Sequence, residues 1–156
     1  MQRILNLLVI LVLFAAPAQA LEPRDGWVIH HTGKSYADLV RDVRAAVRAA
    51  PINIVTQASA SDGARMQGHT IPGNRVFGLY RNDYARRMLD TSIAAGIEAP
   101  IRLYVTEEDD GTATLGYKMP SHVFAPYADE GGAALRALAK ELDAVFEDVA
   151  RAASAE

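Results

Sequence analysis

The sequence contains no cysteine among its 156 residues. This absence excludes disulfide bonds, thiolate metal sites, iron–sulfur clusters, a cysteine nucleophile and a lipid-modified cysteine. It also has no excess of basic charge, since the formal net charge is −3 and the pI is about 5.8. A protein that binds nucleic acid usually carries a basic patch, so no nucleic-acid partner is expected.

Glycine and proline are also too few and too irregular for a repetitive chain. Eleven glycines and seven prolines without a period exclude collagen-like and low-complexity architectures. Hydrophobic residues make up 50% of the chain, which excludes a disordered protein. A chain of this length builds one domain around one core.

The N-terminus has the pattern of a secretory signal peptide. Arg3 provides a basic start, residues 4–16 are apolar except for Asn6, and Ala18-Gln19-Ala20 is a small-x-small cleavage site. The alternative is an uncleaved membrane anchor, but the apolar run is well short of the ~20 residues that span a bilayer. We therefore expect cleavage after Ala20, a periplasmic or secreted protein, and no stable membrane insertion afterwards.

The remaining chain, residues 21–156, is predicted to form a single domain. Strands are indicated at 27–32, 52–58, 75–80, 101–106 and 112–118, and helices at 35–50, 82–95 and 131–153. Ser35 is expected to cap the first helix and Asn82 or Asp83 the second, and Gly96 to end the second. Residues 59–66 are left open between a loop and a single helical turn, and residues 121–129 are a connection.

This order, β-α-β-β-α-β-β-α, predicts an α+β fold. The acidic stretch 107–111 ends in Asp-Gly and joins the last two strands as a hairpin, which requires antiparallel pairing there. The prediction is an antiparallel or mixed sheet covered on one face by helices. A doubly wound nucleotide-binding fold is disfavoured because strand and helix do not alternate throughout.

Several short motifs occur in a familiar order and spacing. They are Arg75-Val76-Phe77-Gly78, Gly96-Ile97-Glu98-Ala99-Pro100, Tyr104-Val105 with Glu108-Asp109-Asp110-Gly111, and Gly116-Tyr117-Lys118-Met119-Pro120. Together they resemble the domain of unknown function 302 family over roughly residues 26–126. The resemblance implies a fold similar to the TATA-binding-protein-like α+β arrangement and no assigned reaction. Gln57 and Ala58 stand near the place where family members often carry an acid and a histidine, so chemistry that needs that pair is not expected here.

Metal and hydrolytic sites find little support in the sequence. The histidines are His30, His31, His69 and His122, and none has a partner at His-x-His or His-x-x-x-His spacing. No serine lies in a Gly-x-Ser-x-Gly elbow. No metal, cofactor or catalytic residue is therefore predicted.

The most distinctive polar stretch runs from His69 to Arg87. Arg81 and Asn82 stand at the start of a predicted helix, where backbone N–H groups and an arginine can bind an anion. Asp83 opposes this because its carboxylate occupies the same positive field. The alternative is that Asn82 or Asp83 only caps the helix and the arginines are solvated.

If there is a ligand site, the sequence places it at Arg81, Asn82 and Arg86 first, and at Asn74 and Arg75 second. Asn82 and Arg86 are four apart and share a helix face. Arg75 and Arg81 stand at opposite ends of one strand, about 20 Å apart at ~3.3 Å per residue. Arg75 joins the group only if the ligand is elongated or the strand bends.

Three functions stay open. The first is a non-catalytic module that binds a small anionic or polar molecule, or a partner protein. The second is an enzyme of unassigned reaction that uses His69 or His122 as general base. The third is a structural domain that self-associates, for example as a homodimer, through a sheet edge or a helix face.

Overall fold

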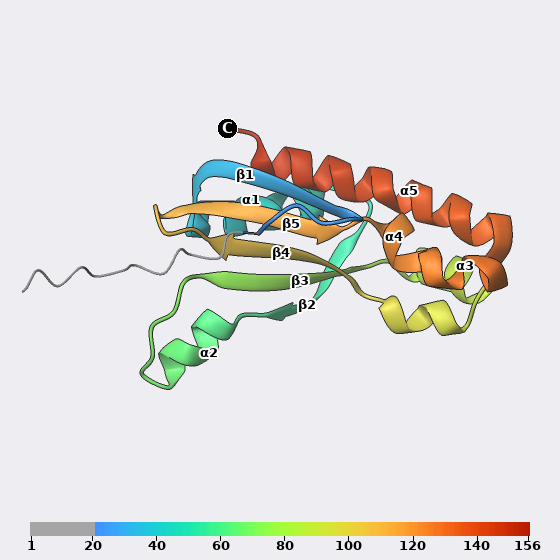
Figure 1. Ribbon diagram of the computed structural model, residues 1–156, viewed down its shortest axis with the longest axis horizontal. Helices are drawn as coiled ribbons and strands as arrows, with labels where there is room; N and C mark the ends of the chain where they lie inside the picture. Colours follow the sequence, from blue (N-terminus) through green and yellow to red (C-terminus); the bar gives the residue numbers. More distant parts are fainter. Residues whose placement is uncertain (1–20) are drawn as a thin grey trace, which may run out of the picture.

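The protein is described here as a computed structural model covering residues 21–156, so the predicted signal peptide lies outside the described residues. Its centre is a five-stranded sheet in the order β1-β5-β4-β3-β2 (Figure 1). Every neighbouring pair is antiparallel, so of the two sheet types that the sequence left open, antiparallel or mixed, the antiparallel one is present. The strands are β1 (Trp27–Ser35), β2 (Asn53–Ala58), β3 (Asn74–Tyr80), β4 (Ile101–Glu107) and β5 (Thr112–Lys118).

The two longest helices cover one face of this sheet, as the sequence predicts. They pack against each other, and α1 also contacts β4 and β5. The helical segments are α1 (Tyr36–Ala49), α2 (Ala60–Met66), α3 (Asn82–Leu89), η1 (Ala94–Glu98), α4 (Pro120–Phe124), η2 (Ala125–Tyr127) and α5 (Ala128–Ser154).

The alternation of residues in β4 shows why only one face is covered. Ile101, Leu103 and Val105 are buried, whereas Arg102 is exposed and Tyr104 half-buried. Successive side chains of a strand point to opposite faces, so the apolar set meets the helices and the other set faces away from them. The predicted one-sided burial of this strand is confirmed.

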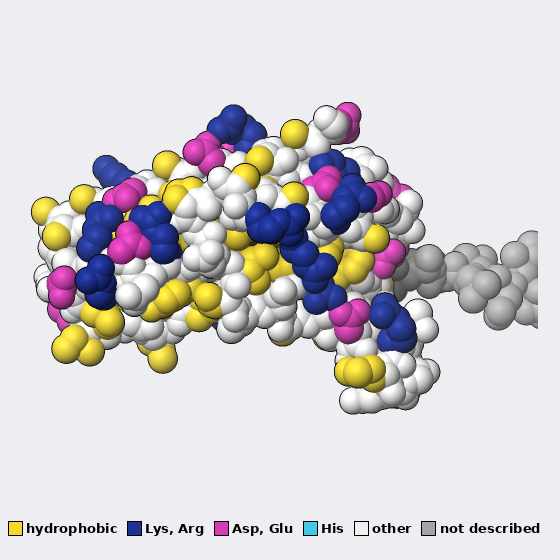
Figure 2. Space-filling view, turned by 180° about the vertical axis from the view of Figure 1, so that it is seen from behind, with side chains coloured by type: hydrophobic (Ala, Val, Ile, Leu, Met, Phe, Trp, Pro, Cys, Tyr) yellow, Lys and Arg dark blue, Asp and Glu magenta, His cyan; other side chains and the backbone are white. Residues whose placement is uncertain are grey.

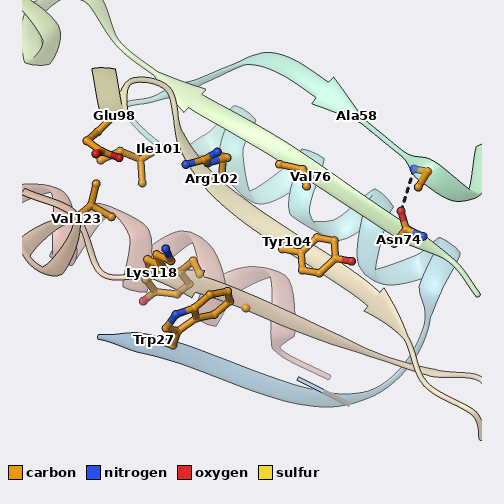
Figure 3. A pocket seen from close by; sticks show the side chains of 13 residues that line it. Trp27, Ala58, Asn74, Val76, Glu98, Ile101, Arg102, Tyr104, Lys118 and Val123 are labelled. Carbon is orange, nitrogen blue, oxygen red and sulfur yellow. Dashed lines mark hydrogen bonds between the residues drawn. The ribbon is translucent and has the colours of Figure 1, made fainter. Parts of the chain in front are cut away.

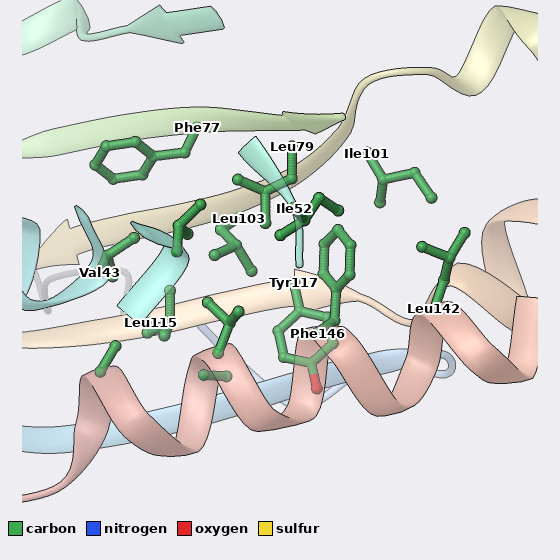
Figure 4. Packing of buried hydrophobic residues seen from close by; sticks show 14 of the residues in the cluster. Val43, Ile52, Phe77, Leu79, Ile101, Leu103, Leu115, Tyr117, Leu142 and Phe146 are labelled. Carbon is green, nitrogen blue, oxygen red and sulfur yellow. The ribbon is translucent and has the colours of Figure 1, made fainter. Parts of the chain in front are cut away.

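The core lies between the sheet and helices α1 and α5 (Figure 4). Phe77 of β3 stands beside Leu103 of β4, which stands beside Tyr117 of β5. The ring of Tyr117 packs against Phe146 of α5 with their centroids 5.6 Å apart. The Tyr117 hydroxyl donates to Glu147 Oε2 at 3.0 Å, so this buried phenol keeps a hydrogen-bond partner.

Helix α1 begins as expected and α3 does not. Ser35 caps α1, its side chain accepting a hydrogen bond from the backbone N–H of Asp38. The N-cap of α3 is Arg81, without a side-chain cap bond, so the prediction of Asn82 or Asp83 as the cap was wrong. The strand ends at Tyr80 as predicted, but the helix begins one residue earlier than a cap at Asn82 would allow, because Asn82 already has helical backbone and Asp83 turns toward Arg81.

Helix α3 also ends earlier than predicted. Its last residue is Leu89, and Gly96 lies inside the separate segment η1. The Thr91 hydroxyl donates to the carbonyl of Met88 at 2.7 Å, and the Ser92 hydroxyl accepts from the N–H of Ala95 at 3.1 Å. These local bonds compete with the continuing helix ladder, which ends α3 before the glycine is reached.

Three other segments are more helical than predicted. Residues 60–66 form a helix, α2, capped by Ser59, and the predicted connection after Pro120 contains α4 and η2. Proline at the first helical position suits a helix start because its N–H would have no partner there. Helix α5 begins at Ala128 instead of Gly131, with a kink at Gly132, where φ is 59°.

The side of the molecule opposite to that of Figure 1 carries basic side chains interspersed with acidic ones (Figure 2). Eight ion pairs join described residues, among them Arg81–Asp83 and Arg87–Glu141. Within residues 21–156 no helix has the length and apolarity needed to cross a bilayer.

Candidate functional site

The face of the sheet that points away from α1 and α5 is here called the open face. It is built from alternate residues of the five strands, as the pairing register shows. These residues are Trp27, Ile29 and His31 of β1, Thr114, Gly116 and Lys118 of β5, Arg102, Tyr104 and Thr106 of β4, Asn74, Val76 and Gly78 of β3, and Thr56 and Ala58 of β2.

The open face is hollow beside Tyr104, where β5 places Gly116. Gly116 of β5 stands between Ile29 and Tyr104 on the neighbouring strands. Gly78 of β3, opposite Arg102 on β4, is by contrast covered by Thr56 and Pro100. A glycine in a strand leaves no side chain above the sheet, which allows another group to approach the backbone closely.

This hollow is a pocket of about 570 Å³, here called the open-face pocket (Figure 3). Most of its wall is apolar or aromatic, with a few polar groups at its margins. The lining residues are Trp27, Ala58, Ala60, Asn74, Val76, Glu98, Ile101, Arg102, Tyr104, Gly116, Tyr117, Lys118 and Val123.

Two aromatic side chains flank the pocket. Trp27 of β1 lies along one wall, with the Lys118 Nζ 5.7 Å and the Arg24 guanidinium 5.6 Å from its ring centroid. A cation at this distance from an indole ring is attracted by the ring's electrons, which orients Trp27. Tyr104 of β4 is the second, and burial raises the pKa of its hydroxyl. The phenol therefore stays protonated at neutral pH and is available as a hydrogen-bond donor.

Two cations face the pocket from the two central strands. The register that pairs Leu103 with Tyr117 places Arg102 and Lys118 beside each other, one residue further along. In the described part of the chain neither side chain takes part in an ion pair or a side-chain hydrogen bond. Like charges on neighbouring strands repel each other, so this arrangement has an unbalanced positive potential.

The single carboxylate that lines the pocket is Glu98, at the end near η1. Its Oε1 accepts a hydrogen bond of 2.8 Å from the Tyr127 hydroxyl. That bond raises the pKa of Tyr127. This hydrogen bond holds the carboxylate toward η2, and Glu98 forms no ion pair with Arg102.

Asn74 is the one predicted site residue that lines the open-face pocket. Its Oδ1 accepts from the backbone N–H of Ala60 at 2.9 Å, and its Nδ2 donates to the carbonyl of Pro72 at 3.1 Å. These bonds hold the first turn of α2 against the start of β3. Asn74 therefore shapes the end of the pocket, with its side-chain polar atoms already in use.

Arg75 points to the other face of the sheet. It neighbours Val105, a core residue, and its side chain is only 16% exposed. Its guanidinium pairs with Asp62 of α2, and that hydrogen bond lowers the pKa of the Asp62 carboxyl. Asn74 and Arg75 therefore do not act on one ligand, as adjacent residues of a strand cannot share a face.

Arg81 and Asn82 lie at the start of α3 and Arg86 in its last turn, and none of the three lines the open-face pocket. Arg81 is held by both oxygens of Asp83, by the carbonyl of Pro51 at 2.7 Å, and by the Tyr84 ring, whose centroid lies 3.9 Å away. The bond from Arg81 lowers the pKa of Asp83. A guanidinium with these partners contributes to the packing of α3 against the end of β3.

The histidines are dispersed, and within residues 21–156 no three His, Asp or Glu side chains gather as a metal site would require. His31 Nδ1 lies 3.1 Å from the Thr114 hydroxyl on the open face, whereas His30 faces the helices. His69 and His122, the candidate general bases, are exposed and do not line the open-face pocket.

The sequence analysis missed Trp27, Arg102 and Lys118 as a group. One signal was present, because Arg102 interrupts the apolar alternation of its strand on the side that faces away from the core. The pairing of β1 with β5 joins residues more than 70 positions apart, and the sequence contains no signal for that register.

Comparisons with known proteins agree with the fold. The family model described as "Domain of unknown function DUF302" matches residues 28–153. A solved structure, that of an uncharacterized conserved protein DUF302 from Bacillus stearothermophilus, superposes with a TM-score of 0.72 at 14% identity, covering 83% of this chain and 99% of that chain. Among curated proteins none matches the chain.

Proposed function

The chain belongs to the DUF302 family, and we propose that its open-face pocket binds a small, largely apolar molecule without transforming it. Family membership confirms the resemblance of the short motifs and leaves the reaction unassigned. The observation that carries the proposal is a pocket of about 570 Å³ beside Gly116 of β5, walled by Trp27 and Tyr104.

Size and lining both support a ligand site. Pockets that bind small molecules are typically about 300–1,000 Å³, with mostly apolar walls and a few placed polar groups. Val76, Ile101 and Val123 provide apolar wall, and Tyr104 provides a hydroxyl. A rigid antiparallel sheet forms the floor, so the pocket exists before any ligand arrives and binding loses little entropy to ordering.

The segments that carry the family resemblance converge on this pocket. The Phe-Gly strand supplies Val76, the Gly-Ile-acid turn supplies Glu98, the aromatic strand supplies Tyr104, and the Tyr-x-x-Pro segment contributes Gly116 and Lys118. Motifs that lie far apart in sequence and meet around one hollow support a shared role there.

Binding without chemistry is favoured by the residue types in the pocket. Its lining contains no histidine and no serine, and its single carboxylate is engaged by Tyr127. General acid–base or nucleophilic catalysis most often uses such a group; among the other lining residues, Tyr104, whose burial raises the pKa of its hydroxyl, is left as a hydrogen-bond donor.

The test uses Trp27, the only tryptophan of the chain, as the reporter. N-phenyl-1-naphthylamine, a neutral aromatic probe, is titrated into the protein while tryptophan emission is excited and energy transfer to the probe is recorded. We expect saturable transfer with the wild-type protein. In Gly116→Val, whose new side chain intrudes into the pocket, we expect transfer to fall by about tenfold or more.

Two control variants locate the bound probe. Ile97→Ser removes an exposed apolar side chain of η1 outside the pocket, and it should leave the titration unchanged. Trp27→Phe should abolish the transfer while probe fluorescence itself still saturates. Absence of saturable transfer in the wild type, or loss of binding in Ile97→Ser with none in Gly116→Val, would contradict the proposed function.

A further inference from the structure

We propose that the ligand of the open-face pocket is an organic acid, whose anionic group binds between Arg102 and Lys118 while its apolar body lies against Trp27 and Tyr104. This inference rests on the proposed function and adds the charge of the ligand to it. Its basis is the pair of cations described above, which stand side by side on β4 and β5 at the edge of an otherwise apolar hollow.

The position of the two cations is unfavourable for the free protein. Adjacent strands lie about 4.8 Å apart, and like charges directly opposite each other destabilise a sheet. Six other arginines of the described residues are paired with carboxylates, among them Arg75, Arg81 and Arg87. Arg102 and Lys118 lack such a partner among the described residues, so a bound anion would remove a repulsion that the fold leaves in place.

The side-chain types also match an acid group. Arginine presents a planar fork of N–H donors that fits the two oxygens of a carboxylate or a sulfonate, and lysine adds a point charge from the neighbouring strand. The Lys118 Nζ lies at the Trp27 ring, so it stands at the wall of the pocket. An acid group placed between them would leave the rest of the ligand in contact with Trp27 and Tyr104.

Glu98 is a lining residue with a negative charge, so its substitution should have the opposite effect on anion binding to that of Arg102 or Lys118. It lines the same pocket, and it is held by the Tyr127 hydroxyl at 2.8 Å. A carboxylate in the pocket repels an anionic ligand. Glu98→Gln keeps an oxygen that accepts from Tyr127 and removes the charge, so it should strengthen the binding of an anion and leave a neutral ligand unaffected.

The test compares two probes that share one aromatic skeleton. 1-Anilinonaphthalene-8-sulfonate carries an acid group that N-phenyl-1-naphthylamine lacks, and energy transfer from Trp27 reports both. We expect the sulfonate to bind wild-type protein about tenfold more tightly than the neutral probe at low salt. Arg102→Gln and Lys118→Gln should each weaken the sulfonate about three- to tenfold and leave the neutral probe within twofold.

Matched controls separate this site from general surface charge. Arg86→Gln on α3 and Lys140→Gln on α5 remove exposed cations away from the pocket, and neither should change the affinity for the sulfonate. Raising the salt concentration should weaken the sulfonate and not the neutral probe, because mobile ions screen partly exposed charges. Inorganic phosphate added as competitor should not displace the sulfonate, since it has no apolar body.

The outcomes are distinct for the two proposals. If the neutral probe binds and the sulfonate binds no better, the inference of an acidic ligand is overturned and the proposed function stands. If neither probe binds, both are overturned. A loss of sulfonate affinity in Arg86→Gln instead of Arg102→Gln would move the anion site to α3, and displacement by phosphate would overturn the organic nature of the ligand.

Discussion

Tyr104 of β4 stands directly opposite Gly116 of β5, so on the open face a large aromatic side chain borders a position that has none. Ile29 of β1 stands on the other side of Gly116. The hollow arises because Gly116 has no side chain between these two larger neighbours, and a larger residue at position 116 would reduce it. The pocket is therefore a property of one glycine and its register.

The two open-face glycines predict opposite responses to substitution. Gly116→Val should raise the free energy of unfolding by about 0.5–1 kcal/mol, because a β-branched residue suits a strand better than glycine. A Cβ there would meet mainly Leu21 Cδ1 at 2.9 Å, the end of a flexible side chain.

Gly78→Ala should destabilise the protein, because its Cβ would stand 2.1 Å from Thr56 Oγ1 and 2.7 Å from Pro100 Cγ. Urea denaturation of the two variants measures both signs; a Gly78→Ala variant as stable as wild type would contradict the tight packing at Pro100.

Leu142 of α5 tests the packing of the long helix on the sheet. Its side chain is 5% exposed, and Leu142→Ala should lower the free energy of unfolding by about 2–5 kcal/mol, the range for emptying a buried leucine site. Leu89→Ala, at a side chain that is 46% exposed, is the matched control and should cost less than about 1 kcal/mol. Equal urea midpoints for the two variants would show that α5 is not packed as described.

The ion pair of Asp62 with Arg75 predicts a pH dependence of stability. The hydrogen bond from Arg75 lowers the pKa of Asp62 in the folded protein, whereas in the unfolded chain it stays at about 3.9. The pair therefore stabilises the fold fully above about pH 5, and this contribution is lost as the pH falls through the folded pKa. Asp62→Asn should be less stable than wild type at pH 7, with the difference shrinking steadily below pH 4.

Urea midpoints measured from pH 7 to pH 2 provide that comparison. Asp148→Asn is the control, because the Asp148–Arg151 pair has both side chains about 70% exposed and should contribute little at any pH. A difference between wild type and Asp62→Asn that stays constant down to pH 2 would exclude the ion pair as its cause.

Residues 1–20 carry a prediction that the described residues do not test. If the segment is a signal peptide, protein expressed with its own N-terminus in a bacterium with a periplasm should be released by osmotic shock with Leu21 as its first residue. Intact-mass spectrometry of that fraction decides it. A species that retains Met1 and sediments with the membranes would support the uncleaved anchor instead.

Local patterns in the sequence predicted the elements and their buried faces, because helix and strand periodicity depends on near neighbours. The alternation around Leu103, the Ser35 cap and the hairpin of β4 and β5 were all correct. The errors at the start and end of α3 arose because the local sequence allows more than one set of hydrogen bonds there. Asp83 and Thr91 each had two local hydrogen-bond choices, and only the assembled chain selected between them.

The candidate site depended on the tertiary structure almost entirely. The sequence analysis began this strand at Arg75 and grouped Asn74 with Arg75; the observed strand includes both residues, which therefore lie on opposite faces. Lys118 and Trp27 become neighbours only through the pairing of β1 with β5. Closing so long a loop costs conformational entropy, and local sequence patterns do not show which distant strands will pair at that cost. Residue types and periodicity determined which side chains leave the core; the register of long-range strand pairing decided which of them meet around the pocket.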